Sequence, residues 1–569
     1  MHHTHHRLRT HRLALCTALA LGAGLVSAGP ATAANVLAAQ ASLAAPATAP
    51  ATAAVATRAK PRFDRDGDGR SDRVFRSADT GRLTVVLSKT GSVVPFTIGH
   101  DDLTGTGSLE VLPADDLWGT TATDLLTLSA GGALRLHSSE APASTAKGLV
   151  WQGEGWQIYN KVLAPGDLTK DGRQDLLART PAGALYLYAG TGRGFDRKGP
   201  FKARVAVGGG WQAYDQLVGT NDLDGDAIAD LVARTPRGDL YFYKGTGSAT
   251  VPFKARVHVG GGWQVYNQVV GADDLNGDGR ADLLARTHSG AFYQYLSTGG
   301  GKFGARTYAG GGGQGLSYHL GQGGVPAHGK HNLFAVDKTG TAFTYGTLAN
   351  GQLAARKPYG GAGENEYHWA MTNGHALDDA DRANVLTAYN PTLWNDRGSV
   401  ASDSGAFYGY AETLGPGDLT GDGKGDVLGL DPWGNVLLHP GLKQSDPPRV
   451  GPALKVGTAW QADTLVGTGD VTGDGRPDLV SRDGTGLYLH AGTGSAAAPF
   501  AARVLIGRGW DVYAHLAAPG DTDGDGRSDL IAVTPGGDVY RYSATGLGGA
   551  ATFASRVKIA SGWAYVHLS

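Results

Sequence analysis

The sequence of 569 residues is long enough for two or more ordinary domains or for one large repetitive domain. Its 90 glycines and two methionines are typical of a turn-rich β-protein and argue against long helices, and a net charge of −2 argues against nucleic-acid binding. Only six of the 52 acidic residues are glutamates, and this excess of aspartate indicates a specific task for the shorter acid.

The first 33 residues have the pattern of a secretory signal peptide. Three arginines precede an apolar run at 13–26, and small residues at 31–33 form a cleavage site. We therefore expect a secreted, extracellular chain that has lost its one cysteine, Cys16. Residues 34–61 are rich in Ala, Thr and Pro and predict a disordered linker. No later apolar segment has membrane-spanning length, so we expect no membrane span.

One block of sequence recurs along most of the chain, which is the pattern of a repeat architecture. Residues 176–192 read LLARTPAGALYLYAGTG, and a second block at 201–214 runs from Phe-Lys-Ala-Arg-Val through a Gly-rich turn to Trp211-Gln-Ala-Tyr214. The first block returns at 231–247, 283–299, 479–494 and 530–546, and the second at 253–266, 500–513 and 553–565.

Each unit of about 51 residues contains four short β-like runs separated by glycine-rich turns. Four strands in a repeat of this length predict an all-β fold, the β-propeller built from four-stranded blades. About ten units can be counted, more than the roughly four to eight blades of one ring. We therefore expect two five-bladed rings, with repeats 1–5 in residues 62–320 and repeats 6–10 in residues 321–569. A single large ring and an uneven split stay open.

The two ends of the repeat region complement each other. The first unit begins at its acidic loop, Asp64, without the Trp-containing strand that normally precedes it, and the chain ends on such a strand around Trp563. The C-terminal strand can therefore close a ring. With two rings, residues 314–320 would close the first and Trp563 the second, which would remove an exposed sheet edge.

An acidic loop occurs in seven of the units, with the pattern Asp-x-(Asp/Asn/Thr)-x-Asp-Gly-x-x-Asp. Oxygen-bearing side chains stand at loop positions 1, 3, 5 and 9, and a turn residue stands at position 6. Calcium takes about six to eight oxygen ligands, and carboxylates this close repel one another without a cation. The pattern therefore predicts calcium loops. A structural role for the metal is favoured over calcium that bridges a ligand and over a catalytic metal.

Three other loop families begin in the same way. An EF-hand requires Glu at position 12 and flanking helices, dockerins also flank the loop with helices, and thrombospondin type 3 repeats require Cys. Here position 12 is Phe75, Ala178 or Ala233 in the first three loops, and β-like runs follow. Over essentially all of residues 62–569 the chain instead resembles the FG-GAP-like or VCBS-type repeat, as in the integrin α-subunit propeller.

This resemblance implies calcium ligation by the residues at positions 1, 3, 5 and 9, at up to about seven sites. Ala227 departs from the pattern because it replaces the turn glycine. The unit at Asp116 has Trp118 and Thr120 at ligand positions and is not expected to bind metal, and the region 322–385 has no intact loop. The implied ligands are Asp64, Asp66, Asp68, Asp72, Asp167, Thr169, Asp171, Asp175, Asp222, Asp224, Asp226, Asp230, Asp274, Asn276, Asp278, Asp282, Asp418, Thr420, Asp422, Asp426, Asp470, Thr472, Asp474, Asp478, Asp521, Asp523, Asp525 and Asp529.

A Trp recurs at one repeat position, mostly with a Tyr three residues later. The pattern fits either a ring of sugar-stacking platforms or packing between blades, and we favour packing because nearly every clear repeat has it. A recurring Arg is expected to support adjacent turns or carboxylates. The residues are Trp156, Trp211, Trp263, Trp460, Trp510 and Trp563, and Arg179, Arg234, Arg286 and Arg482.

No nucleophile elbow, His-Glu-x-x-His motif or Ser/His/Asp pattern marks a catalytic site. The stretch 361–400 breaks the repeat and holds Glu364, Glu366, His368 and His375; we interpret it as a decayed blade, although loop insertions can carry function. We therefore predict a monomer that is not an enzyme but an extracellular binding module for a glycan, cell-wall or protein ligand. A polysaccharide-acting enzyme, with its site in the channel or at 361–400, and a purely structural surface protein are the alternatives.

Overall fold

A computed structural model describes most of the chain from residue 60 onward. Residues 1–59, with the predicted signal peptide and most of the predicted linker, lie outside the described residues. Among the described residues, none lies in a helix long and apolar enough to cross a membrane. The described residues are 60–77, 83–96, 108–120, 123–129, 131–138, 148–192, 199–310, 316–320, 332–359, 369–374, 384–389, 392–395, 398–402, 409–442, 449–458, 460 and 464–569.

The described chain is all-β, built from antiparallel sheets of four strands in succession, which confirms the predicted propeller blades. The burial of each strand follows from its pattern of apolar and polar residues. The strand Asp175–Arg179 is buried throughout because neighbouring blades cover both of its faces, whereas the next strand, Leu185–Tyr188, alternates buried Leu with half-buried Tyr. Five short 3-10 turns occur among the described residues: η2 (Trp156–Ile158), η3 (Trp211–Ala213), η4 (Trp263–Val265), η5 (Trp510–Val512) and η6 (Gly549–Ala551).

Five blades form the first ring, because their innermost strands contact one another in succession. Phe75 and Val86 of blade 1 pack against Phe292 of blade 5 and complete the circle. Blade 1 is β22 (Leu316–Leu320), β1 (Arg73–Ser77), β2 (Leu83–Val86) and β3 (Val93–Phe96); blade 2 is β4 (Ser108–Pro113), β5 (Asp124–Ser129), β6 (Leu134–Ser138) and β7 (Leu149–Gly153); blade 3 is β8 (Lys161–Gly166), β9 (Asp175–Arg179), β10 (Leu185–Tyr188) and β11 (Val205–Gly208); blade 4 is β12 (Gln216–Asn221), β13 (Asp230–Arg234), β14 (Leu240–Tyr243) and β15 (Val257–Gly260); blade 5 is β16 (Tyr266–Gly271), β17 (Leu283–Thr287), β18 (Phe292–Tyr295) and β21 (Thr307–Gly310), beside a small sheet of β19 (Ser297–Gly299) and β20 (Lys302–Phe303).

The second ring is built in the same way from the remaining five sheets. Its blade 7 carries a fifth, parallel strand, and the described parts of the atypical stretch 361–400 form strands of this blade, as the sequence predicted. Glu364, Glu366, His368 and His375 lie outside the described residues. Blade 6 is β43 (Tyr565–Leu568), β23 (Asn332–Asp337), β24 (Ala342–Gly346) and β25 (Lys357–Pro358); blade 7 is β26 (Trp369–Gly374), β27 (Asn384–Tyr389), β28 (Thr392–Asn395), β29 (Gly398–Ser402) and β33 (Arg449–Val450); blade 8 is β30 (Glu412–Gly417), β31 (Asp426–Leu430), β32 (Val436–His439) and β34 (Leu454–Gly457); blade 9 is β35 (Thr464–Gly469), β36 (Asp478–Asp483), β37 (Gly486–His490) and β38 (Val504–Arg508); blade 10 is β39 (His515–Gly520), β40 (Asp529–Val533), β41 (Val539–Tyr542) and β42 (Val557–Ala560).

Each ring closes by pairing a late strand with an early one. In the first ring β22 lies antiparallel to β1, with Phe75 opposite His319. In the second ring the C-terminal strand β43 pairs with β23, with Ala335 opposite Leu568. Both closures are the ones that the phase of the repeat predicted for two rings.

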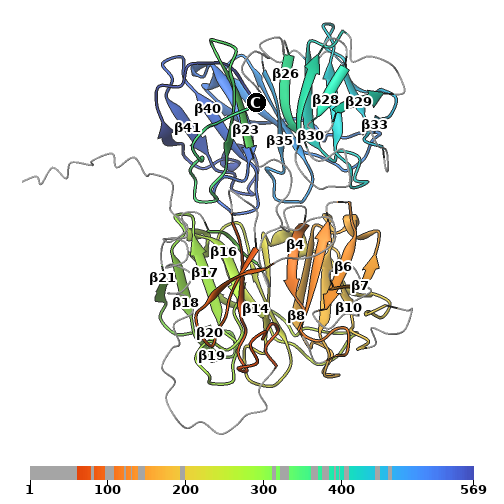
Figure 1. Ribbon diagram of the computed structural model, residues 1–569, viewed down its shortest axis with the longest axis vertical. Helices are drawn as coiled ribbons and strands as arrows, with labels where there is room; N and C mark the ends of the chain where they lie inside the picture. The colour runs from red at the N-terminus through yellow and green to blue at the C-terminus, as the bar shows by residue number, and fades with distance from the viewer. Residues whose placement is uncertain are drawn as a thin grey trace, which may run out of the picture.

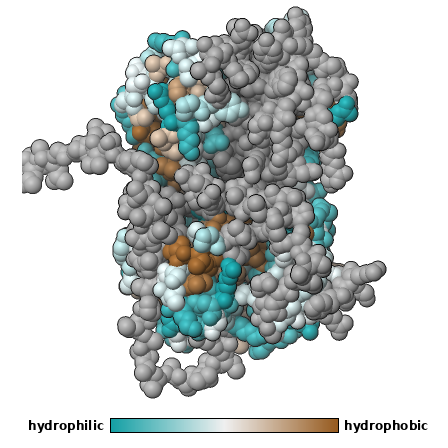
Figure 2. Space-filling view, viewed as in Figure 1, coloured by the Kyte–Doolittle hydropathy of each residue, from teal (hydrophilic) through white to brown (hydrophobic). Residues whose placement is uncertain are grey.

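The two rings stack along the long axis of the molecule, the second above the first in Figure 1. Their cores are separate clusters between neighbouring blades, such as the Leu-rich cluster around Leu163 and Leu217 in the first ring. Figure 2 shows apolar residues gathered on the visible face of the first ring, with hydrophilic residues around them. Large exposed apolar side chains also occur on outermost strands, where no further strand covers them, as at Val257 and Val557.

Candidate calcium loops and their surroundings

Six of the acidic loops join the innermost strand of a blade to the next strand, whereas the loop that begins at Asp64 leads directly into β1. The loops are held by their own carboxylates. Between β12 and β13, Asp222 accepts hydrogen bonds from the backbone N–H groups at loop positions 4, 5 and 6, at 2.6, 3.0 and 2.7 Å. Asp230, at position 9, accepts from the N–H of position 2 at 3.0 Å and from that of Gly245 at 2.7 Å. Asp is suited to these positions because its short side chain can reach the backbone of its own loop.

The side chain at position 3 has a different environment. The Oδ1 atoms of Asp66, Asp224 and Asp523 and the Oγ1 atom of Thr169 are buried without a hydrogen-bond partner. A buried polar oxygen without a partner is costly in free energy. These atoms are hard oxygen donors inside a tight loop, and that donor set fits calcium.

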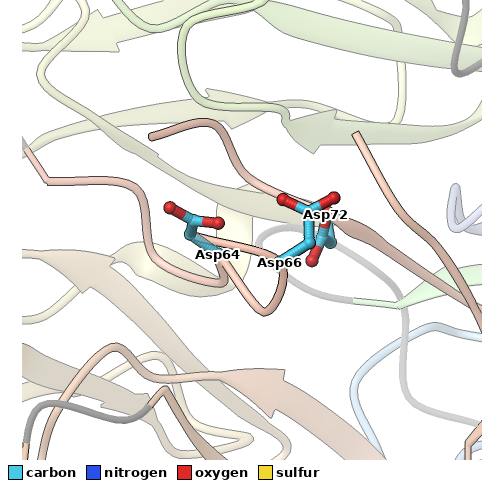
Figure 3. Close-up of side chains that lie close together, drawn as sticks. All are labelled: Asp64, Asp66 and Asp72. Atoms are coloured by element: carbon cyan, nitrogen blue, oxygen red, sulfur yellow. The ribbon is translucent and has the colours of Figure 1, made fainter. Parts of the chain in front are cut away.

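Three loops bring carboxylates together closely enough to share one cation. In each group one oxygen atom from each of three aspartates lies within 4.8 Å of the others. Figure 3 shows one group on its loop, Asp64, Asp66 and Asp72. The other groups are Asp222 with Asp224 and Asp226, and Asp521 with Asp523 and Asp529. These are the three loops with Asp at position 3, whereas the other four loops have Thr or Asn there.

Burial and mutual repulsion also mark these carboxylates. Burial, together with neighbouring aspartates, raises the pKa of Asp175, Asp282 and Asp478 to about 7. Backbone N–H donors to the same carboxylates act in the opposite direction but do not cancel this shift. A divalent cation would offset the burial and the repulsion and hold these groups deprotonated.

The loop at Asp116 shows which positions shape the turn and which are left for a ligand. Asp116 accepts the N–H groups of Gly119 and Thr120 at 2.6 and 2.7 Å, and Asp124 accepts that of Trp118 at 2.6 Å. The turn is therefore retained although positions 3 and 5 carry no carboxylate. The acids at positions 1 and 9 are thus sufficient to hold the described part of this loop, residues 116–120, so the acids at positions 3 and 5 of the other loops need a separate explanation.

Basic side chains reach two of the three groups, which the sequence pattern did not indicate. Lys244 bonds to Asp224 and lies 2.7 Å from Asp226. Asp523 lies 3.3 Å from His288, which belongs to the other ring, and 3.5 Å from Arg541. These contacts partly neutralise the loops, and a bound cation would compete with them.

The loops of the second ring form part of the contact between the rings. Asn160 donates to the carbonyl oxygen of Asp474 at 2.7 Å, and Asn267 donates to that of Asp523 at 2.6 Å. A cavity of about 330 Å³ lies beside the first of these contacts, between the Trp156 turn and the loops that begin at Asp418 and Asp470.

The recurring tryptophans pack between blades, as predicted. Trp156, Trp211, Trp263 and Trp510 are each 7% exposed and belong to the inter-blade clusters. Burial to this degree leaves no face of these four rings for a sugar.

The recurring arginines support neighbouring turns, as predicted, with one exception. Arg179, Arg234 and Arg482 donate to carbonyl oxygens of the Trp turn of the next blade, at 2.5 to 3.4 Å. Arg286 differs because it donates to the Ala349 carbonyl of the second ring at 3.0 Å.

Comparisons with known proteins agree with the loop pattern. The FG-GAP-like repeat model matches residues 222–285 and 470–532, one segment in each ring. No curated protein matches the chain. A solved structure, the BP39L lectin from Burkholderia pseudomallei, aligns at 11% identity over 80% of this chain and 99% of the lectin, with a TM-score of 0.26, too low to support an argument. The chain therefore contains FG-GAP-like repeats in both of its rings, which confirms the resemblance inferred from its sequence.

Proposed function

We propose that the protein is a secreted, calcium-stabilised β-propeller monomer that acts as a non-catalytic extracellular binding module, with a glycan as its ligand. Residues 62–320 and 321–569 are its two propeller domains, and the residues at loop positions 1, 3, 5 and 9 are its calcium ligands. Cell-wall material and a protein partner are the other ligands that an experiment must include.

One observation carries this proposal: the same candidate metal loop is repeated in several blades with the same backbone hydrogen bonds. In Asp222 and its counterparts Asp418 and Asp470, the carboxylate at position 1 accepts three N–H groups from its own loop. A catalytic metal requires an open coordination position and a substrate path at one place. A metal repeated at equivalent turns instead supports the frame, which leaves the surface of the blades for recognition.

The test is a retention assay with the mature chain, from residue 34 onward, on insoluble polysaccharides, isolated cell walls and immobilised extracellular proteins. Each support is tested in calcium and after chelation, while near-ultraviolet circular dichroism reports folding. Saturable retention of folded protein on a glycan support is the expected result. Retention only on a protein support, or release of sugar from a polysaccharide, would refute the proposal.

A further inference from the structure

Blade 9 differs from five other described blades at the aromatic cluster beside its Trp turn. In five described blades two tyrosine hydroxyls bond to each other at this place. In blade 10, for example, the hydroxyls of Tyr513 and Tyr542 lie 2.5 Å apart, and Arg556 donates to Tyr513 at 2.5 Å. The two phenol rings fill the space between the Trp, the Phe and the Arg of the repeat.

Both tyrosines are replaced in the sequence of blade 9. The repeat places Asp463 at the position of Tyr513 and His490 at the position of Tyr542. His490 turns to Ser481 within its own blade, with 2.8 Å between Nε2 and Oγ, and stacks on Trp460 with ring centroids 4.4 Å apart. Arg503, the counterpart of Arg556, bonds to Asp483 at 3.4 Å. The sequence of blade 9 therefore lacks the two tyrosines that fill this space in the other five blades.

A cavity of about 510 Å³ occupies this part of blade 9, within the range of roughly 300–1,000 Å³ typical of small-molecule sites. Its walls include Trp460, Phe500 and the buried His490, and Asp483 and Arg503 stand at its rim. Apolar and aromatic walls with a few polar groups are the usual composition of such a site.

The rim groups indicate what kind of ring would enter. The side chains of Asp483 and Arg503 are 45% and 51% exposed, so both are accessible to a ligand from outside. Together they offer an acceptor and a forked donor side by side, which matches neighbouring hydroxyls on one ring. A saccharide ring has such hydroxyls and also C–H groups that pack against aromatic side chains, whereas a simple phenol has one hydroxyl.

We propose that this cavity, lined by Trp460, His490 and Phe500 with Asp483 and Arg503 at its rim, binds a single saccharide unit of a glycan. The ligand ring takes the space that the tyrosine pair fills in the five other blades, and its hydroxyls replace the tyrosine hydroxyl as partners of Arg503. This site deepens the proposed function, on which its biological meaning rests.

The test uses the mature chain in calcium, methyl glycosides of common hexoses and deoxyhexoses as probes, and p-cresol as a mimic of a tyrosine side chain. Titration calorimetry and saturation-transfer NMR measure binding. We expect at least one glycoside to bind with a Kd of about 1 mM or tighter. Tighter binding of p-cresol than of every glycoside, or no saturable glycoside binding up to about 50 mM, would overturn the proposal.

Two variants separate this site from a general effect on folding. His490→Tyr restores the side chain of the repeat, so it should weaken glycoside binding at least about 10-fold without lowering the unfolding midpoint. Arg503→Ala should weaken binding by a similar factor, about 10-fold, through loss of a charged donor, whereas Arg556→Ala at the equivalent place in blade 10 should not change it. Unchanged glycoside binding by folded His490→Tyr would place the ligand elsewhere and overturn the proposal.

The same variants distinguish this inference from the proposed function. If His490→Tyr no longer binds glycosides but stays on polysaccharide supports, the cavity is confirmed and a further glycan contact exists. If the wild-type chain binds glycosides but is retained on no polysaccharide, the cavity is confirmed and the glycan module is refuted. If polysaccharide retention persists in a chain that binds no methyl glycoside, the module stands and the cavity proposal fails.

Discussion

Replacement of Arg62 by alanine is expected to destabilise the first ring more than any change at a surface ion pair. Arg62 precedes β1 and is 3% exposed. Its Nε donates to Asp273 at 2.6 Å, and its Nη atoms donate to the carbonyl oxygens of Gly219 at 2.7 Å and Gly271 at 3.1 Å. One side chain thus links the innermost strands of blades 4 and 5 to the segment that enters blade 1.

The magnitude follows from what the truncation leaves behind. Asp273 is 5% exposed and would lose its cationic partner inside the protein. Breaking a buried pair on one side costs about 3–5 kcal/mol, because the remaining charge is uncompensated. The two carbonyl groups would also lose a donor, although water entering the space can replace part of that loss. We therefore expect a loss of about 4 kcal/mol in the free energy of unfolding.

Urea unfolding of the mature chain in calcium, followed by tryptophan fluorescence, measures this loss as a shift of the unfolding midpoint. The double variant Arg62→Ala/Asp273→Ala removes the orphaned charge and should recover about 1–2 kcal/mol. Lys558→Ala is the matched control, because its 2.7 Å pair with Asp538 is exposed to solvent and should change stability little. A loss below about 1 kcal/mol for Arg62→Ala would refute the reasoning, since that is the cost of an exposed pair.

Three further predictions concern the loops and blade 9. Ala227 stands at loop position 6 with φ 64°, a conformation that favours glycine, and the other loops have glycine there. Ala227→Gly should therefore stabilise the protein by up to about 1 kcal/mol, as measured by thermal unfolding, and Gly279→Ala should destabilise it. Asp66→Ala should remove one bound calcium per chain in equilibrium dialysis while Asp116→Ala removes none; equal stoichiometry in both variants would contradict the assignment of position 3. Burial, with a smaller contribution from Arg503, lowers the pKa of His490 to about 4, so its neutral form stabilises the fold above its ordinary pKa of about 6.5. That contribution, up to about 3 kcal/mol, should be lost as the pH falls from about 6.5 to about 4, and the fall should be absent from His490→Gln.

The repeat made much of the fold predictable. The phase of the units predicted ring closure by residues 314–320, which the pairing of β22 with β1 confirms. The burial of Trp156 and its counterparts was predictable from their recurrence, because a residue that recurs in nearly every clear repeat is expected to pack between the blades.

Features that occur once were harder to predict. Arg62 lies outside the repeat, and only the folded chain brings it to Asp273, which is 211 residues away. Asn160 lies just before β8 and Asn267 lies near the start of β16, and no feature of the sequence there marks them, yet they contact loops of the other ring. The blade 9 cavity had a sequence signal in Asp463 and His490, which stand where five other blades have a pair of tyrosines. That signal is a departure from the repeat, and a residue that departs from a repeat does not by itself indicate a cavity.

The stacking of the rings gives the loops of the second ring a task that the loops of the first ring do not share. The first ring meets its neighbour through Asn160 and Asn267, which lie at the ends of their strands opposite to the acidic loops of the same blades. The second ring meets these two residues through the loops themselves, since the acceptors are backbone carbonyl groups of Asp474 and Asp523. A cation in either loop would fix the backbone that carries these acceptors, so its binding free energy would add to ring docking as well as to blade stability. Calcium in the first ring would stabilise only that ring, because its loops face away from the contact.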